Sequence, residues 1–205
     1  MKSLVRNIFN SNFSRKIRNS INFRQIIFNR NIPGSSSVSD SFLWRTDNSF
    51  VTKFKFTDIL NLYNEIDDSW IEIHFYNRHN FYIKKIIIEK LDYSNEILID
   101  KNFMSNLESY GTFYVYHRTN KNINEDIISN RCYIGYSQYN NLFSFVHGNC
   151  YSQYLNNKTG KINKDIVQIS IRKNQIYNIQ KYFDNYDKLE LAFVNPTQNK
   201  LNFTI

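Results

Sequence analysis

Four histidines are the side chains of this sequence best suited to acid–base or metal chemistry near neutral pH. His74 shares a predicted strand face with Glu72, whose carboxylate would orient the imidazole ring. A surface pair on a solvent-facing strand face explains both residues equally well. His79 falls in a predicted turn, where solvation accounts for it. None of these histidines belongs to a recognised catalytic motif.

The other two histidines each follow apolar residues on one strand face. His117 follows Phe113 and Val115 at alternate positions, and His147 follows a similar aromatic pair. This placement would bring both to a pocket mouth, where a sugar-modifying enzyme would use them as catalytic groups. We favour a structural interpretation, in which each is a core or rim histidine that donates to a backbone carbonyl.

A second candidate group opens the predicted domain. Trp44 stands beside Arg45 and Asp47, and an indole next to an arginine–carboxylate pair is suited to stack on and hydrogen-bond a sugar ring. The same residues would equally well close the bottom of a core. We assign no catalytic residue, and the candidate ligand-binding residues are Trp44, Arg45, Tyr116, His117, His147 and Asn149.

Several motifs are missing from the sequence. It has no Gly-rich phosphate loop, no GxSxG elbow and no HExxH pair, which disfavours the enzyme classes that depend on them. Cys132 and Cys150 form no CxxC pair, so we interpret them as free thiols, with one disulfide as the alternative. We expect no metal and no cofactor. Only a cupin-like site, which gathers His and Glu from several strands, would escape such a search.

The positive charge is confined to one end of the chain. Residues 1–39 contain seven Lys and Arg residues and no Asp or Glu, while the whole chain has a net charge of +8. The remaining residues are therefore nearly neutral. A neutral body argues against nucleic acid as a partner, because that affinity depends on many neutralised phosphates.

An apolar residue recurs at every fourth position of the basic segment, at Val5, Phe9, Phe13, Ile17 and Ile21. On a helix this row would lie on an anionic membrane surface, which makes residues 1–30 a candidate membrane contact. The segment is also Arg-rich, Ser-rich and free of acids, as in a transit peptide for organelle import. A disordered basic tail that only aids solubility is a third interpretation.

No run of the sequence is long and apolar enough to span a membrane, and polar residues interrupt the arm too often for a secretory signal peptide. We therefore expect a cytoplasmic protein, peripheral at the inner membrane if the arm binds lipid. Residues 32–37, with Pro, Gly and consecutive Ser, are typical of a linker. The predicted division is an arm and linker over residues 1–34 and a β-sandwich domain over residues 35–205.

Short alternating runs separated by polar clusters predict a mostly β fold, an antiparallel β-sandwich or jelly roll behind a helical or disordered basic arm. Residues 70–89 form the clearest hairpin, with a turn at 77–80 and with Glu72 and His74 on a solvent-facing side. A short helix is expected over 57–63, capped by Thr57 or Asp58, and a turn over 124–129. Further strands are expected at 51–57, 96–99, 111–117, 132–136, 142–147, 166–172, 189–194 and 201–205. Because alternation continues to residue 205, we expect the natural chain to continue beyond it.

Several segments together resemble bacterial β-sandwich proteins of uncharacterised activity from surface-polysaccharide (lipopolysaccharide or capsule) biosynthesis loci. They are residues 37–45, 110–113, 117, 131–136, 144–149 and 193–197. The resemblance implies a β-sandwich with a basic arm, and a setting in surface-glycan assembly, but no catalytic residue. Cys132 departs from the pattern, which has a small or apolar residue there.

These observations lead to one hypothesis and a rival, and a third alternative is an organelle-targeted protein whose arm is the import signal. The hypothesis is an accessory, non-enzymatic protein that binds a glycan, a nucleotide sugar or a glycan-assembly enzyme. The rival is a sugar-modifying enzyme that uses His117 and His147.

Overall fold

The computed structural model describes residues 11, 13–14, 17, 25–28, 32, 35–121, 127–128, 132–139, 142–147, 151–163, 167–170 and 190. The chain divides into two compact units. One is Arg30–Ile166, and the other combines Met1–Asn29 with Val167–Ile205. This grouping differs from the predicted division at residue 34, because β1 (Gln25–Phe28) pairs antiparallel with β14 (Val167–Ser170).

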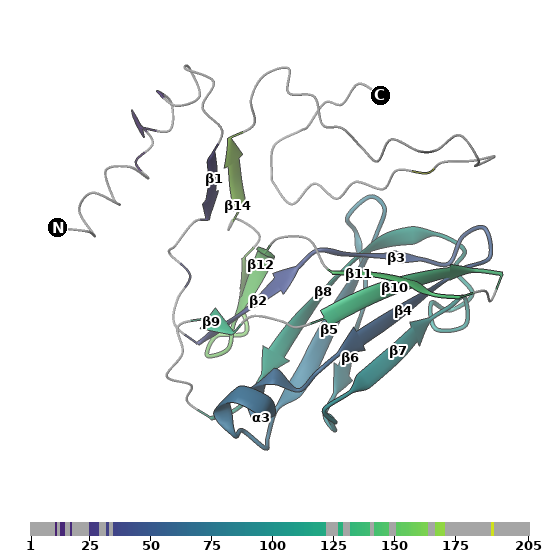
Figure 1. Cartoon of the computed structure of the whole chain (residues 1–205). Helices are drawn as coiled ribbons and strands as arrows, with labels where there is room; N and C mark the ends of the chain where they lie inside the picture. The colour runs from purple at the N-terminus through teal and green to yellow at the C-terminus, as the bar shows by residue number, and fades with distance from the viewer. Residues whose placement is uncertain are drawn as a thin grey trace. The chain divides into compact units, whose positions relative to one another are not determined.

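The described strands of the larger unit form three four-stranded sheets (Figure 1). The central sheet has the order β3-β8-β5-β6, from β3 (Phe42–Arg45), β8 (Tyr110–Arg118), β5 (Trp70–Asn77) and β6 (Tyr82–Ile88). The β4 sheet has the order β11-β10-β4-β7, from β11 (Ser144–His147), β10 (Cys132–Gln138), β4 (Phe50–Phe56) and β7 (Asn95–Ile99). The β2 sheet has the order β13-β12-β2-β9, from β13 (Ile162–Asn163), β12 (Tyr151–Asn156), β2 (Ser36–Asp40) and β9 (Ile127–Ile128).

The main core lies between the central sheet and the β4 sheet. Alternate residues of β5, Ile71, Ile73 and Phe75, are fully buried against it. Phe113 of β8 and Phe54 of β4 meet edge to face, with ring centroids 5.0 Å apart. The pairings within these two sheets are antiparallel. The predicted mostly β, sandwich-like fold is therefore confirmed.

The opposite face of the central sheet is also buried, which the sequence analysis did not expect. Glu72 and His74 are only 6% and 9% exposed, so the predicted solvent-facing side of β5 is wrong. On the same face the tyrosines of β5 and β8 pack against Leu155 of β12. The β2 sheet thus adds a third layer, and polar residues of β5 are enclosed rather than solvated.

Strand β2 corrects the predicted linker, since Ser36 and Ser37 belong to it. Its backbone pairs with β12 and β9, while β3, one residue further on, pairs with β8 of the central sheet. The Ser37 hydroxyl accepts a hydrogen bond from the His117 N–H at 2.8 Å, and the Ser39 hydroxyl accepts one from the Val115 N–H at 2.7 Å. Serine side chains therefore replace backbone carbonyls where the chain changes sheets.

The predicted hairpin at residues 70–89 is confirmed as β5 and β6. Asn77 Oδ1 accepts hydrogen bonds from the N–H groups of His79 (2.9 Å) and Phe81 (3.0 Å), which closes the turn. Beside this end of β5, a Cβ on Gly111 would lie 2.1 Å from the Tyr76 carbonyl oxygen. Only glycine allows β8 to approach β5 so closely there.

The remaining predicted elements have mixed outcomes. The short helix is confirmed as α3 (Ile59–Asn64), and Asp58 is its N-cap. Within the predicted turn at 124–129, Ile127 and Ile128 form β9, and the other four residues lie outside the described ones. The predicted strands at 51–57, 96–99, 111–117, 132–136 and 142–147 are confirmed with shifted ends. The described part of the predicted strand at 166–172 is β14, and residues 166, 171 and 172 lie outside the described ones. Those at 189–194 and 201–205 fall outside the described residues, apart from residue 190.

Two members of the predicted apolar row in the arm are described. Phe13 and Ile17 are helical and 73% and 47% exposed. Among the residues that the structure describes, no helix is long and apolar enough to cross a membrane.

Candidate functional site

The connection from α3 to β5 is fixed by one carboxylate. Asp58 Oδ1 accepts a hydrogen bond from the Asn61 N–H at 3.1 Å, which caps the helix. Its Oδ2 accepts a hydrogen bond from the Ser69 hydroxyl at 2.7 Å. Glu65 ends the helix in the left-handed conformation, with φ of 55°. This loop therefore delivers the chain to β5 with Trp70 as its first residue.

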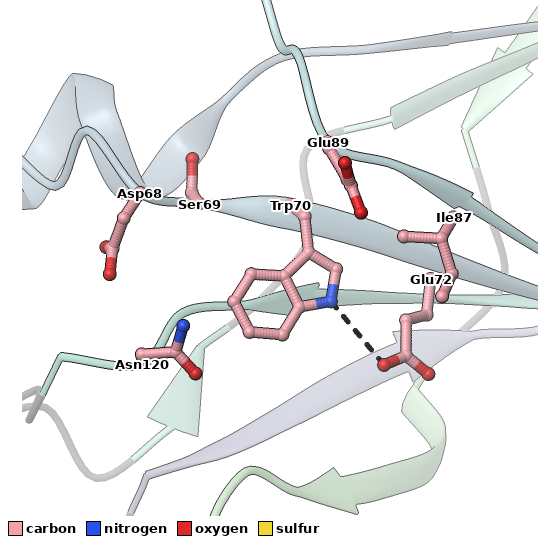
Figure 2. A pocket seen from close by; sticks show the side chains of 7 residues that line it. All are labelled: Asp68, Ser69, Trp70, Glu72, Ile87, Glu89 and Asn120. Carbon is pink, nitrogen blue, oxygen red and sulfur yellow. Dashed lines mark hydrogen bonds between the residues drawn. The ribbon is translucent and has the colours of Figure 1, made fainter.

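A hollow of about 480 Å³ opens at this end of the central sheet. Its lining residues are Asp68, Ser69, Trp70, Glu72, Ile87, Glu89 and Asn120. Strand register explains why they meet, because Glu72 of β5 lies opposite Ile87 of β6, and Trp70 lies opposite Arg118 at the end of β8. Figure 2 shows the Trp70 indole in the middle of the group, with Asp68 and Asn120 to one side and Glu72 to the other.

Glu72 is the buried charge at the base of the hollow. Its carboxylate contacts His74 Nε2 at 3.2 Å, the Arg118 guanidinium and Lys85 Nζ at 3.6 Å. The hydrogen bond with His74, aided by the positive charges of Arg118 and Lys85, lowers the pKa of Glu72 to about 2 despite its burial. Glu72 therefore stays ionised at neutral pH.

The indole of Trp70 is held from two directions. Its Nε1–H donates to Glu72 Oε1 at 3.5 Å, as Figure 2 shows. The guanidinium carbon of Arg118 lies 5.4 Å from the centroid of the indole ring. Because Trp70 is only partly buried, the arrangement presents an oriented aromatic surface in a hollow whose other lining residues, apart from Ile87, are polar.

The predicted residues at the start of the domain lie elsewhere. Trp44 is fully buried in the main core, and its indole N–H donates to the Tyr76 carbonyl at 2.9 Å. Arg45 donates to both carboxylate oxygens of Asp47, at 3.0 and 2.8 Å, and covers the ring of Phe50. None of these side chains lines the hollow.

The other candidates are spread over the fold. Tyr116 is buried and donates its hydroxyl to Gln153 Oε1 at 2.8 Å, and burial raises its pKa well above the ordinary value. His117 is also fully buried, but as the next residue of β8 it faces the opposite side of the strand. His147 is exposed on β11, with its ring centroid 4.5 Å from that of Tyr133. Asn149 lies outside the described residues.

The buried histidine has an unusual environment. Neither ring nitrogen of His117 has a hydrogen-bond partner among the described residues, so the expected bond to a backbone carbonyl is not found there. Burial lowers the pKa of His117 to about 3. The described members of the predicted set are not brought together in the hollow, and their role as ligand contacts stays a prediction.

The Trp70 hollow was missed by sequence reasoning because it depends on the register of three strands. One signal was present, since Asp67, Asp68 and Ser69 immediately precede Trp70 at a strand start. In the described part of the chain, no group of three or more His, Cys, Asp or Glu side chains is placed to hold a metal ion. No known protein family, curated protein or solved structure matches this chain.

Proposed function

We propose that this protein is an accessory carbohydrate-binding β-sandwich protein of surface-glycan assembly, and that the Trp70 hollow is its glycan site. The observation that carries the proposal is the partly exposed indole of Trp70 in a hollow lined by carboxylate and amide side chains. An aromatic face packs against the apolar face of a sugar ring, and carboxylates and amides accept hydrogen bonds from its hydroxyl groups. The proposed role is binding, without catalysis.

The rigidity of the site supports this proposal. Glu72 and Arg118 fix the indole before any ligand arrives, so little conformational entropy is lost on binding. The rival enzyme hypothesis requires His117 and His147, and the hollow contains neither of them.

The charge of the lining favours a free glycan over a nucleotide sugar. Asp68 and Glu89 line the hollow without an ion pair to a described residue, and their carboxylates would repel the diphosphate of a nucleotide sugar. The glycan itself, rather than its activated precursor, is therefore the proposed ligand. A glycan-assembly enzyme remains the proposed protein partner, on the basis of the resemblance.

The proposed location is the cytoplasmic face of the inner membrane. Seven basic residues and no acidic residue in the first 39 positions support this proposal, because such a segment is attracted to anionic lipid headgroups. The segment would concentrate the protein where surface glycans are assembled.

Tryptophan fluorescence tests the proposed glycan site directly. The chain has two tryptophans, and Trp44 is fully buried, so a ligand-dependent change in emission reports on Trp70. We expect a glycan from a panel of bacterial surface oligosaccharides to change the emission, and Trp70→Ala to lower its affinity about tenfold or more.

Tyr139→Ala is the matched control, because Tyr139 is 70% exposed and does not line the hollow. It should bind as the wild type does. Unchanged glycan affinity in a folded Trp70→Ala variant, measured by calorimetry, would rule out the proposed site.

A further inference from the structure

We infer that the Trp70 hollow selects glycans that carry a free amino group, and that Glu89 sets this specificity. The inference rests on the proposed function and names the ligand class of the same site. It comes from the balance between the carboxylates that line the hollow and the cations that neutralise them.

The charge of Glu72 is already compensated within the protein. Arg118 and Lys85 both form ion pairs with its carboxylate, and His74 adds a hydrogen bond. Glu72 is also only 6% exposed. It therefore orients Trp70 and offers little net charge to a ligand.

Asp68 and Glu89 are different, since neither forms an ion pair within the part of the chain that the structure describes. Asp68 accepts a hydrogen bond from the neutral Thr119 hydroxyl at 2.6 Å. Its charge interacts with the Lys121 ammonium group, which is itself paired with Asp67. Glu89 is exposed and forms no ion pair with a described residue, so its charge is available to a ligand in the hollow.

An amino sugar matches both features of the hollow. Its ring provides an apolar face for the Trp70 indole, and its protonated amine provides a cation with three donors for Glu89 and Asp68. An acidic or phosphorylated sugar would instead place its negative charge next to these two carboxylates, which would repel it. A lysine side chain would supply the ammonium group but no ring to stack on the indole.

Paired oligosaccharides that differ only at the amine provide the test. We would titrate the full chain with oligomers of glucosamine and of galactosamine, and with their N-acetylated counterparts, by calorimetry at low and high salt. N-acetylation removes the charge and keeps the ring. We expect the free-amine oligomers to bind roughly fivefold tighter at low salt, with the difference shrinking at high salt.

Two substitutions test whether Glu89 and Trp70 have the roles assigned to them in amine recognition and ring stacking. Glu89→Gln should weaken binding of the free-amine oligomer more than that of the acetylated oligomer, and so remove most of the preference for the amine, whereas Trp70→Ala should weaken both to a similar extent. Glu96→Gln is the matched control, because Glu96 is an exposed glutamate of β7 that does not line the hollow.

The outcomes separate this inference from the proposed function. Equal binding of both oligomers, or binding of other glycans but neither aminated oligomer, would overturn the amine specificity and leave the glycan site standing. Binding of a lysine-rich peptide as tight as that of the amino sugars would also overturn it. If no glycan binds at all, the proposed function and this inference fail together.

Discussion

Strands β5 and β8 bury both of their faces, and the two faces are chemically opposite. Toward the β4 sheet they present Ile71, Ile73 and Phe113, which belong to the apolar cluster of the main core. Toward the β2 sheet they present Glu72 and Tyr116, each with a hydrogen-bond partner. The first face is stabilised by removal of apolar area from water, and the second by satisfaction of buried polar groups.

The contrast between the two faces bears on how an alternating strand is interpreted. Alternation of apolar and polar residues predicts which side chains share a face. This prediction was correct for every residue of β5 from Ile71 to Tyr76. It does not tell whether the polar face meets water or a third layer. Substitutions that remove a contact from one face test whether the two faces differ in this way.

The largest effect is expected on the apolar face. Phe113→Ala should lower the free energy of unfolding by about 3 to 5 kcal/mol, because it opens a cavity among the packed rings of Phe42, Phe54 and Phe75. Urea denaturation measures this change. Phe81→Ala, at a 68% exposed position in the hairpin turn, should have little effect, and equal losses in the two variants would refute the assigned core.

A smaller loss is expected at the buried carboxylate on the polar face. Glu72→Gln should lower the free energy of unfolding by about 2 to 3 kcal/mol, because the Arg118 guanidinium loses its charged partner. Glu96→Gln, which removes an exposed partner of Lys53 and Lys55, should cost less than about 1 kcal/mol. Similar costs measured by urea denaturation would mean that Glu72 is solvated after all.

His117 predicts a pH dependence with a definite sign. Its pKa is about 3 in the folded state, below the ordinary value of 6.5, so below pH 6.5 the unfolded chain binds more protons. The stability that His117 contributes is present above pH 6.5 and is lost as the pH falls. Between about pH 7 and pH 5 this loss is about 2 kcal/mol for one such group.

Comparison with His117→Leu isolates this loss. Burial raises the pKa of Asp40 to about 6, which has the opposite sign and partly masks the histidine in the wild type. The stability difference between the wild type and His117→Leu should therefore change by about 2 kcal/mol over that pH range. His79→Leu, at an exposed turn position, serves as the control. A constant difference in thermal or urea denaturation would show that His117 is reached by water.

The smallest effect is expected from one hydroxyl group. Tyr116→Phe keeps the ring but leaves Gln153 Oε1 without its donor, and it should cost about 1 kcal/mol of unfolding free energy. Stability equal to that of the wild type, by the same urea measurement, would mean that the amide finds another partner. The two faces would then be less different than the contacts indicate.

Local patterns in the sequence predicted the elements that depend on local interactions. The Asn77 turn and the Asp58 cap are formed by hydrogen bonds within four residues, so the hairpin and helix α3 were found. Strands β2, β3, β12 and β13 were not predicted. Strand β2 is rich in serine and resembles a linker, and its burial depends on distant partners, since Ser37 and Ser39 meet β8 about 80 residues away.

The candidate site was less predictable than the fold, for a related reason. Trp44 and Trp70 both occur at strands near charged residues, and no local pattern distinguishes the buried one from the one that lines a hollow. The strand register determines which tryptophan lines the hollow, because Trp70 lies opposite Arg118 at the open end of the sheet. Single-sequence reasoning does not supply that register.

The serine contacts between β2 and β8 have a consequence for hydrogen exchange. The amide protons of Val115 and His117 are protected by Ser39 and Ser37 and not by a neighbouring strand carbonyl. Their exchange with deuterated solvent therefore requires the β2 sheet to detach from the central sheet, even if the central ladder stays intact. These two protons are built-in reporters of that detachment, and their exchange rates measure how tightly the third layer is held.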